Sequence, residues 1–327
     1  MSLATSGLSL GVDVGGTKIL AVACDPSGVE VASSQASSPQ GTAPDGGVAL
    51  ADAVAEVVVD VADQLSVRPT DIPLGIGLPG MLTLDGILAF APNLRNASGS
   101  DLGALLAARL RTTSVVVAND ADCAAIAEQR LGAARGHGDV IMITLGTGIG
   151  GGILLGGELL RGGHGFAGEV GHMVVDIDGP ACPCGSRGCW ERFASGSAVG
   201  RLAREAAHAG RLSRLVDAAG GDAESIRGED VTAAALAGDP EALALMDEVG
   251  WWLARGIANL ACVLDPSCVV IGGGMSEVIP LLIAPAAAAL PELLEGGARR
   301  PPVALVPAAL GARAGALGAS LLARRPS

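Results

Sequence analysis

The sequence predicts an α/β protein built from two similar lobes. With 327 residues the chain exceeds the usual size of a single hydrophobic core. Two segments, 8–24 and 140–155, each show an apolar strand, a turn rich in glycine and threonine, and a second apolar strand. Apolar strands alternate with helical segments along most of the chain, which is typical of α/β proteins. We therefore expect one α/β lobe to begin at each of these two hairpins.

The composition limits the ligands and partners of the protein. Half of the residues are hydrophobic and 17% are charged, whereas aromatic residues make up 2% and tyrosine is absent. A ligand should therefore be recognised mainly by hydrogen bonds. The formal net charge of −13 argues against nucleic acid or an anionic membrane as a partner, because both require a basic surface. An anionic ligand such as a nucleotide would need backbone N–H groups, a few cations and a metal ion.

We expect a cytoplasmic protein from three further features. The first residues lack the basic start and apolar run of a secretory signal. The apolar segment at 281–294 is interrupted by Pro285 and Pro291, and no uninterrupted apolar run reaches the length of a membrane span. The chain has seven cysteines, which suits a reducing compartment if three of them bind a metal.

The first hairpin, LSLGVDVGGTKILAVAC, contains a candidate phosphate-binding turn. Asp13 is a single acidic residue within an apolar strand. Gly15 and Gly16 allow backbone N–H groups to approach a phosphate, Thr17 adds a hydroxyl and Lys18 adds a cation. The turn is neither a Walker A loop nor a GxGxxG motif that opens a helix. A Gly-Gly turn of this kind also occurs as a plain hairpin turn, and the neighbouring Asp13, Thr17 and Lys18 favour the functional interpretation.

The segments between the two hairpins follow the α/β pattern. We expect a loop or irregular edge strand at 26–47, an amphipathic helix at 48–65, a buried strand at 73–80, a turn at 91–94, a helix at 102–110, a strand at 114–118 and a helix at 124–131. The turn at 91–94 presents the amide of Asn93.

A cluster of polar residues, Asn119-Asp120-Ala121-Asp122, follows the strand at 114–118. Ligands of open α/β sheets bind beyond the carboxyl ends of the strands, which is where Asn119 and Asp120 lie. A residue of this type between a strand and a helix can instead cap the helix. Capping by Asp122 would leave Asp120 free for chemistry.

The second half of the chain continues with helices and one glycine-rich strand. We expect helices at 197–215, 230–237 and 239–264, a strand at 269–274 and a final helix at 311–323. The strand at 269–274 ends in three glycines, which suits a close approach of the backbone to a nucleobase or ribose. Trp251 and Trp252 are expected in the core rather than in a site.

The segment 169–196 predicts a structural zinc site. His172, Cys182, Cys184 and Cys189 offer one imidazole and three thiolates, which is a ligand set of closed tetrahedral zinc sites. Cys182 and Cys184 are too close in sequence for an easy mutual disulfide, and three clustered cysteines leave one unpaired in any scheme. The alternative is three reduced thiols near an unrelated histidine.

Together these motifs resemble the ROK family, which contains sugar kinases and repressors. The resemblance rests on DVGGTK at 13–18, NDAD at 119–122, LGTGIGGG at 145–152, EVGH at 169–172, CPCGSRGCWE at 182–191 and IGGG at 271–274. It implies an actin/hexokinase-like (ASKHA) fold with two α/β lobes and a central ligand cleft. We expect the first lobe at 1–118 plus 301–327, and the second, with the zinc site, at 119–300.

The resemblance also implies roles for these residues. Asp120 would be the general base for a sugar 6-hydroxyl, and Asp13 would hold Mg²⁺. The phosphates of ATP would face the two turns, formed by Gly15, Gly16, Thr17 and Lys18 and by Gly146, Thr147 and Gly148, and Gly273 and Gly274 would flank the adenosine. The sugar would be bound by Asn93, Asn119, Asp120, Glu169, His172 and Glu191, with His172 also on zinc. Glu169 and Glu191 can alternatively be solvated acids.

The implied activity is ATP-dependent phosphorylation of a hexose, with glucose as the first choice. The text PNLRNASGS and Ala118 depart from the usual glucose kinases of the family, so N-acetylmannosamine, mannose, fructose and amino sugars are alternatives. A non-catalytic sugar-sensing regulator is less favoured, because fewer than ten residues precede the first hairpin. Family members are commonly dimers or tetramers, and we expect a homo-oligomer.

Overall fold

The computed structural model describes residues 7–41, 45–112 and 115–324, which form two compact units. Unit 1 comprises the described residues of 1–138, 152–168 and 309–327, and unit 2 comprises 139–151 and 169–308. These bounds differ from those of the expected lobes, because residues 301–308 belong to unit 2, whereas residues 152–168 and residues 119–138 belong to unit 1. The helix in this segment packs against the C-terminal helix, which lies in unit 1 as expected.

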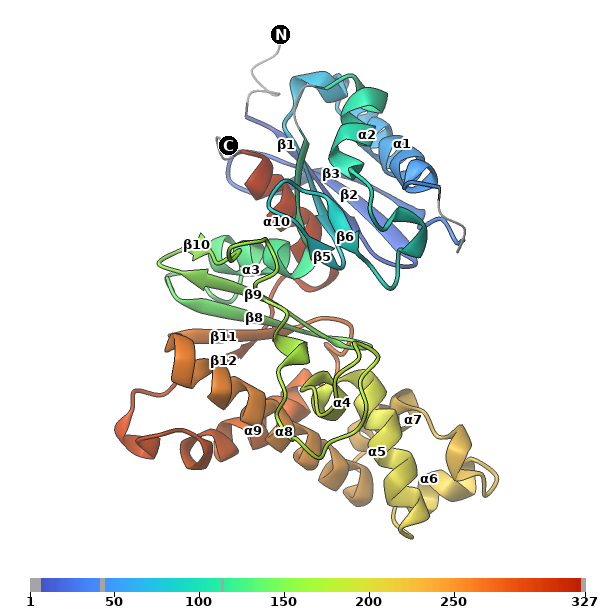
Figure 1. Ribbon diagram of the computed structural model, residues 1–327, viewed down its shortest axis with the longest axis vertical. Coiled ribbons are helices and arrows are strands. Elements are labelled where there is room, and N and C mark those ends of the chain that lie inside the picture. The colour runs from blue at the N-terminus through green and yellow to red at the C-terminus, as the bar shows by residue number, and fades with distance from the viewer. Residues whose placement is uncertain (1–6, 42–44, 113–114, 325–327) are drawn as a thin grey trace. The chain divides into compact units, whose positions relative to one another are not determined.

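Unit 1 is organised around a five-stranded sheet with the order β3-β2-β1-β4-β7 (Figure 1). Its strands are β1 (Ser9–Val14), β2 (Lys18–Cys24), β3 (Glu30–Ser37), β4 (Leu74–Leu78) and β7 (Val115–Asn119). The first two strands form the expected antiparallel hairpin, and β3 is the expected edge strand. The strands β1, β4 and β7 run parallel, so their carboxyl ends lie at one edge of the sheet.

Helices cover both faces of this sheet. The helices α1 (Val48–Gln64) and α2 (Leu102–Leu110) pack on one face, and α10 (Ala314–Ala323) packs on the other, with α3 (Asp120–Arg130) beside it (Figure 1). The contact of α10 is unusually close, because a Cβ atom on Gly11 of β1 would lie 1.9 Å from the Ala316 carbonyl oxygen. A Cβ on Gly75 of β4 would lie 2.0 Å from that of Ala319. The absence of side chains at these glycines of the central strands therefore allows α10 to pack closely on the sheet.

The remaining elements of unit 1 are short. A two-stranded sheet joins β5 (Met81–Leu82) to β6 (Leu88–Phe90), and two 3-10 turns are η2 (Pro69–Asp71) and η3 (Arg95–Ala97). A third 3-10 turn, η7 (Gly311–Arg313), leads into α10. The helix α3 begins four residues earlier than the expected start at residue 124, because the polar residues after β7 cap it and form its first turn.

The second sheet has the order β10-β9-β8-β11-β12. Its strands are β8 (Val140–Leu145), β9 (Ile149–Leu155), β10 (Glu158–Leu159), β11 (Cys268–Gly272) and β12 (Ala304–Pro307), and the boundary between the units falls within β9. The helical elements of unit 2 are η4 (Val170–His172), α4 (Glu191–Ala194), α5 (Gly196–His208), α6 (Ser213–Ala218), η5 (Ala223–Ser225), α7 (Gly228–Leu236), α8 (Pro240–Leu264), α9 (Ile279–Leu293) and η6 (Gly297–Arg299).

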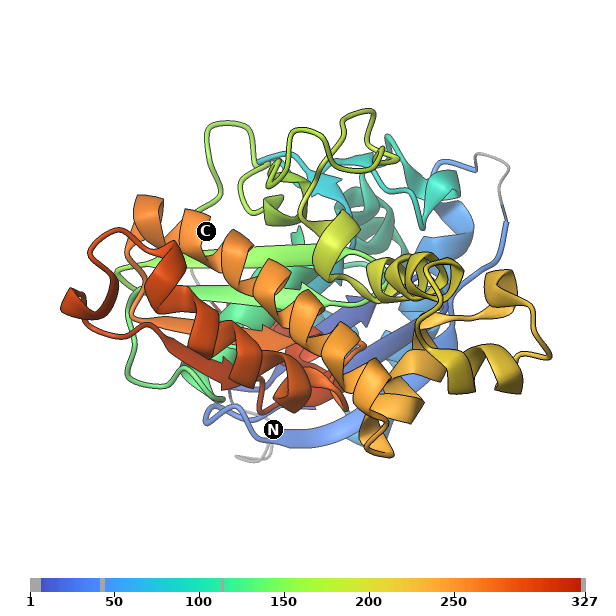
Figure 2. The same cartoon turned by 90° about the horizontal axis from the view of Figure 1, so that it is seen from below.

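The long helices α8 and α9 lie side by side (Figure 2). Asp239 caps α8 as expected, because its carboxylate accepts the N–H groups of Glu241 and Ala242. Both prolines of the 281–294 segment lie inside α9, and Pro285 fits against Gly250 of α8. Among the helices of the described ranges, none is both long and apolar enough to cross a membrane.

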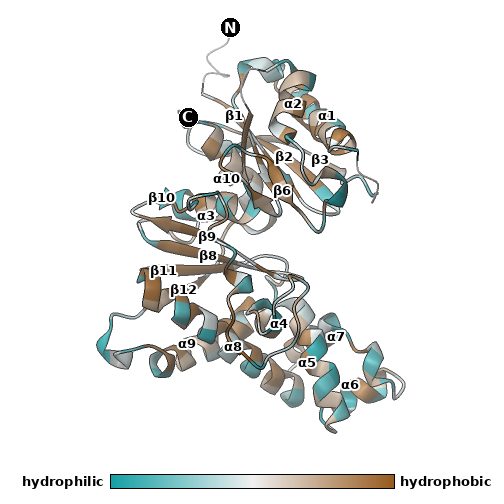
Figure 3. Cartoon of the chain, viewed as in Figure 1, coloured by the Kyte–Doolittle hydropathy of each residue, from teal (hydrophilic) through white to brown (hydrophobic). Residues whose placement is uncertain are grey.

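The apolar core follows the strands and the inner helix faces (Figure 3). Trp190 is fully buried, and its indole N–H donates to the Trp252 carbonyl oxygen at 2.8 Å. The expectation that Trp251 lies in the core is wrong, because 40% of its surface is exposed. Adjacent residues of a helix face different directions, so Trp252 stacks on Phe193 while Trp251 faces more toward solvent.

Candidate functional site

In unit 1 the candidate site lies at the carboxyl edge of β1, β4 and β7. Asp13 of β1 is in register with Gly77 of β4, and Gly77 is in register with Ala118 of β7. A Cβ atom on Gly77 would lie 3.5 Å from the Asp120 Cα and 3.7 Å from Asp13 Oδ1. The fold therefore brings Asp13 and Asp120 to opposite sides of one glycine, although 107 positions separate them in the sequence.

The Asp13 carboxyl group is held in a confined position. Burial raises the pKa of Asp13 to about 6, and the charge of Lys18 partly opposes this shift. The carboxyl group packs directly against α10, because a Cβ on Gly315 would lie 2.6 Å from Asp13 Cγ. A carboxylate confined in this way is costly to ionise without a cation, which suits a residue that binds one.

The helix α3 places Asp120 at its first position. Its cap is Asn119, whose Oδ1 accepts the N–H groups of Ala121 and Asp122, so the capping role considered for Asp120 and Asp122 belongs to Asn119. The Asn119 amide also donates to the Gly80 carbonyl oxygen at 3.1 Å. One oxygen of the half-buried Asp120 carboxylate accepts the Ala121 N–H at 2.8 Å. The described bonds therefore commit the Asn119 side chain to the backbone.

Hydrogen bonds within the turn and from Ser38 fix the turn at Gly15–Lys18. The Gly15 N–H donates to the Lys18 carbonyl oxygen, and the Ser38 hydroxyl donates to the Gly15 carbonyl oxygen at 2.5 Å. The exposed Asn93 lies beside this turn, because a Cβ on Gly16 would lie 3.4 Å from the Asn93 Cβ. One sequence signal was missed here: Lys18 is the only lysine of the chain, and all other basic side chains are arginines.

Unit 2 contains the second candidate phosphate turn. The Gly146 N–H donates to the Gly148 carbonyl oxygen at 3.0 Å, and the Ser197 hydroxyl donates to the Thr147 carbonyl oxygen at 2.7 Å. Gly273 has a positive φ of 98°, and a Cβ there would lie 2.5 Å from the Leu145 carbonyl oxygen. Only glycine fits this position without strain. The turn and the glycines after β11 therefore pack together.

Glu191 connects this turn to the cysteine-rich segment. A Cβ on Gly148 would lie 2.5 Å from Glu191 Oε2, so the carboxylate occupies the space beside the turn. Its other oxygen accepts the Cys182 thiol at 3.2 Å and lies 3.8 Å from His172 Nδ1. The exposed Glu169 begins the η4 turn that ends at His172, where the His172 N–H donates to the Glu169 carbonyl oxygen.

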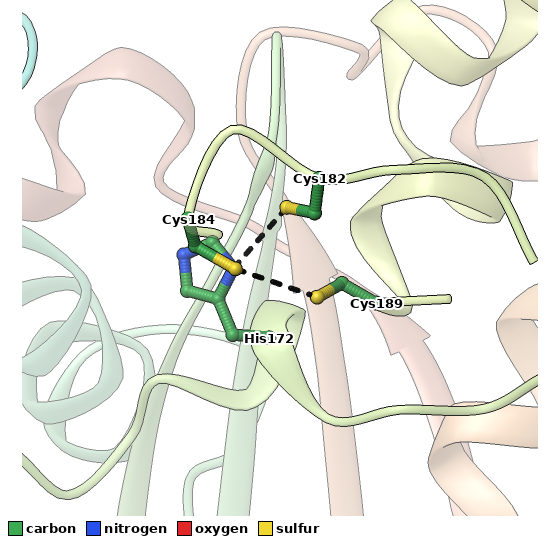
Figure 4. A group of neighbouring side chains, drawn as sticks. All are labelled: His172, Cys182, Cys184 and Cys189. Atoms are coloured by element: carbon green, nitrogen blue, oxygen red, sulfur yellow. Dashed lines mark hydrogen bonds between the residues drawn. The ribbon is translucent and has the colours of Figure 1, made fainter. Parts of the chain in front are cut away.

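His172, Cys182, Cys184 and Cys189 converge as the sequence predicts (Figure 4). Their ligand atoms all lie within 4.8 Å of one another. The Cys184 and Cys189 sulfurs are 3.6 Å apart, and Cys182 Sγ is 3.8 Å from His172 Nδ1. Figure 4 shows the second ring nitrogen of His172 pointing away from the thiols. All seven cysteines of the chain are free of disulfide bonds.

The cluster geometry fits a tetrahedral zinc ion. Zinc–sulfur bonds of about 2.3 Å at tetrahedral angles place sulfur atoms about 3.8 Å apart. The observed separations of the ligand atoms, from 3.6 Å to at most 4.8 Å, include this value. Burial raises the pKa of the Cys182 and Cys189 thiols, whereas the Ser186 N–H lowers the pKa of Cys184. The four side chains thus offer the ligand types and spacing of a metal site, and none of the cysteines forms a disulfide.

The cluster is anchored at both ends of its loop. Gly188 permits a tight contact, because a Cβ there would lie 1.6 Å from the Asp176 carbonyl oxygen. Trp190 follows the last cysteine directly and packs into α8, where a Cβ on Gly256 would lie 2.0 Å from its ring. Phe193 stacks on Trp252 with ring centroids 4.1 Å apart. The loop therefore depends on α8 for its position.

The site residues expected from the sequence thus fall into two groups. Unit 1 brings together Asp13, Gly15, Gly16, Thr17, Lys18, Asn93, Asn119 and Asp120, and unit 2 brings together Gly146, Thr147, Gly148, Glu169, His172, Cys182, Cys184, Cys189, Glu191, Gly273 and Gly274. Two contributors were not expected, Gly77 and Gly315. Their signal in the sequence is weak, because each is one of 49 glycines.

Comparison with known proteins places the chain in a family. The model of the ROK family matches residues 9–326. A glucokinase from Streptomyces coelicolor is 39% identical over 323 residues, which cover 98% of each chain. The structure of a ROK family glucokinase from Streptomyces griseus, in complex with glucose and AMPPNP, matches with a TM-score of 0.82 and 38% identity, covering 98% of this chain and 100% of that one.

A third similar protein is the ROK hexokinase from Thermus thermophilus. Its structure matches with a TM-score of 0.80 and 32% identity, and the match covers 96% of this chain and 97% of that chain. The chain therefore belongs to the ROK family. The resemblance and the actin/hexokinase-like α/β fold that the motifs predicted are confirmed.

Proposed function

We propose that the protein is a hexose kinase that transfers the γ-phosphoryl group of Mg-ATP to the 6-hydroxyl of glucose. The observation that carries this proposal is the placement of Asp13 and Asp120 beside Gly77, at the carboxyl edge of the unit 1 sheet. Two carboxylates in different environments at one edge suit two different roles: one can bind a cation and the other can accept a proton. The similarity to a glucokinase along 98% of the chain supports the same reaction.

Asp120 is proposed as the general base. Its carboxylate would accept the proton of the sugar 6-hydroxyl while the hydroxyl oxygen attacks the γ-phosphorus of ATP. The bond between that phosphorus and the bridging oxygen breaks, and ADP leaves. The Ala121 N–H donates to one oxygen of the carboxylate and so helps to fix its orientation. A fixed orientation matters because the base must lie within hydrogen-bond reach of the proton.

Asp13 is proposed to hold the magnesium ion, directly or through water. When bound, the ion neutralises charge on the phosphates of the nucleotide. The buried Asp13 fits this role because a cation offsets the cost of ionising it. The Gly15–Lys18 turn would direct backbone N–H groups and the Lys18 ammonium toward the phosphates. The Gly146–Gly148 turn is proposed for the same substrate, and Gly273 and Gly274 for its adenosine.

The sugar hydroxyls are proposed to bind Glu169, His172 and Glu191 in unit 2, with Asn93 and Asp120 in unit 1. Asn119 is a weaker candidate for the sugar, because its amide oxygen and its amide nitrogen both form hydrogen bonds to backbone groups. The free ring nitrogen of His172 is available for a hydroxyl, since Nδ1 faces the thiols. The side chain would thus orient a metal ligand and a substrate contact together.

We further propose that His172, Cys182, Cys184 and Cys189 bind a structural zinc ion. The support is the donor set, which fits zinc in type and spacing. Such an ion contributes on the order of 10 kcal/mol to folding and keeps Glu169, His172 and Glu191 in place. Zinc thiolates need a reducing environment, so we propose a cytoplasmic location. A homo-oligomeric state remains our expectation, which light scattering would test.

The experiment that tests the reaction measures ADP release from Mg-ATP. Purified protein is assayed without sugar and then with glucose, mannose, N-acetylmannosamine, glucosamine and fructose in turn. We expect strong stimulation by glucose. Stimulation by another sugar alone would retain the mechanism and attribute the preference to the segment 93–99, which lies beside the Gly15–Lys18 turn at Asn93. If no sugar stimulates zinc-containing protein, the kinase proposal is wrong and a sugar-binding role is the alternative.

A further inference from the structure

Glu128 is a buried carboxylate outside the groups described above. Its side chain has an exposed fraction of 0% and lies in the last turn of α3. Glutamate is rarely buried completely unless it is paired, and a carboxylate near the C-terminus of a helix is disfavoured by the helix dipole. Within the described ranges Glu128 takes part in no ion pair. A residue this unfavourable for its position requires compensating contacts.

Those contacts come from backbone N–H groups of two separate segments. Glu128 Oε2 accepts the Ala133 N–H at 2.8 Å, and Oε1 accepts the Leu310 N–H at 2.9 Å. Gly132 passes directly over the carboxylate, because a Cβ there would lie 2.0 Å from Oε2. The carboxylate therefore joins the end of α3 to the loop that follows it and to a residue 182 positions later.

Leu310 lies where the chain enters α10. The 3-10 turn η7 follows it directly, and α10 begins at Ala314. The first turn of α10 contains Gly315, which packs against the Asp13 carboxyl group. One turn later Gly318 packs against α3, where a Cβ would lie 1.8 Å from the Cys123 carbonyl oxygen. Fixing Leu310 thus fixes the approach of α10 to Asp13.

The other end of this connection is Asp120. It begins α3, whereas Glu128 lies eight residues later, about 12 Å along a helix that rises about 1.5 Å per residue. At that separation Glu128 cannot touch the atoms that react at Asp120. It can only determine how α3, which carries Asp120, lies against α10, which confines Asp13.

We propose that Glu128 is a positioning residue for the phosphoryl transfer. Its carboxylate holds α3 and the start of α10 in one arrangement, so that Asp13 and Asp120 keep their relative position at the sheet edge. This inference rests on the proposed roles of these two aspartates. Misplacement of reacting groups by about 1 Å can lower a rate on the order of 100-fold, so loss of the connection should lower turnover.

The test uses two variants that disturb the connection in different ways. Glu128→Gln keeps the shape but presents an NH₂ group to one of the two N–H donors, so one bond is lost. Gly132→Ala keeps the carboxylate but displaces it, because the added Cβ would lie 2.0 Å from Glu128 Oε2. Each should lower kcat about 10-fold or more while KM for the sugar changes less than about 3-fold. The double variant should lose little more than either single variant, because both break one connection.

The control is Leu106→Ala, which removes a buried side chain from α2 on the opposite face of the sheet. It should lower stability and leave kcat per folded molecule unchanged at a temperature where circular dichroism shows all variants folded. If Glu128→Gln loses stability as Leu106→Ala does but keeps its kcat, the proposal is wrong. The same holds if the effects of Glu128→Gln and Gly132→Ala on kcat multiply independently.

A second readout separates this inference from the proposed reaction. Amide hydrogen exchange of residues 119–124 and 314–318 should rise in both Glu128→Gln and Gly132→Ala, and stay at the wild-type level in Leu106→Ala. If wild-type protein shows no sugar-dependent ADP release, the kinase proposal fails by that result alone. The exchange data then still decide whether Glu128 holds the two helices, and unchanged exchange in both variants would overturn it.

Discussion

At the scale of single residues, the two aspartates of unit 1 differ in their surroundings. Asp13 is confined between Gly77 and Gly315, and burial raises its pKa. Asp120 is half-buried at the start of a helix, where N–H groups point outward and favour a negative charge. A cation therefore gains most at Asp13, and this difference in surroundings supports the different roles proposed for the two aspartates.

Asp120→Asn should remove most of the turnover. The amide cannot accept the hydroxyl proton, so kcat should fall by roughly 10²- to 10⁴-fold, while sugar affinity stays within a few-fold. Steady-state kinetics and calorimetric sugar binding measure the two effects. Asp101→Asn is the control, because Asp101 caps the helix α2 and its carboxylate also accepts a backbone N–H group, that of Ala104. Near-normal turnover in Asp120→Asn would exclude the proposed role of Asp120.

Asp13→Asn should stabilise the magnesium-free protein at neutral pH. The folded-state pKa of about 6 lies above the usual 3.8, so the stability associated with protonated Asp13 is complete below pH 3.8 and is lost as the pH rises through 6. At pH 8 this loss amounts to about 3 kcal/mol, which the neutral asparagine avoids. The same substitution should abolish turnover, because the proposed magnesium ligand is gone.

The measurement is denaturant unfolding of both proteins at several pH values between 4 and 8, in buffer without magnesium and without chelators. The stability difference between Asp13→Asn and wild type should grow as the pH rises. A difference that is constant across this range would show that ionisation of Asp13 does not lower the free energy of unfolding. Stabilisation together with lost activity would be an example of a functional residue held at a cost to stability.

At the scale of elements, the cysteine-rich loop has little regular structure. Between η4 and α4 it contains isolated bridges, such as Val174 with Cys189 and Ala181 with Arg187. Ile177 is 79% exposed, so the loop buries few apolar side chains of its own there. Its order therefore depends on the cysteine cluster and on Trp190, which is fully buried against α8.

Cys184→Ser should lose zinc and stability together. A hydroxyl is a poor substitute for a thiolate, so zinc content should fall from about one per chain to well below half, and the melting temperature should fall with it. Metal analysis and thermal unfolding provide the measurements. Cys262→Ser is the control, because Cys262 is exposed on α8 and lies outside the cluster. Full zinc content in Cys184→Ser would contradict the ligand assignment.

Many elements could be predicted from the sequence because their signals are local. The helix at 102–110 was predicted with its observed bounds, and the hairpin at 8–24 follows from apolar strands around a glycine turn. The helix α9 was not predicted, because Pro285 and Pro291 suggested interruption. Contact with Gly250 of α8 compensates there, and such tertiary contacts leave no pattern within the segment itself.

At the scale of the whole molecule, the motifs could be predicted from the sequence, but the contacts between segments distant in the sequence could not. The four cluster residues span only 18 positions, so their spacing already indicates a shared ligand. The hydrogen bond between Glu128 and Leu310 joins residues 182 positions apart, and neither segment has a sequence pattern that indicates the other as its partner. The same limitation explains why the expected lobe bounds and the observed units differ at residues 119–138, since the packing of α3 on α10 joins this segment to unit 1.

The position of α10 in the chain has a consequence for biosynthesis. A ribosome that adds about 5 to 20 residues per second needs roughly ten to forty seconds to pass from the end of α3 to the end of α10. During that interval β1 and β4 are complete, yet the face that α10 later covers stays open to solvent or to a chaperone. Asp13 acquires its confinement by Gly315 only after this delay, so the edge proposed for catalysis is not assembled in the nascent chain until α10 docks.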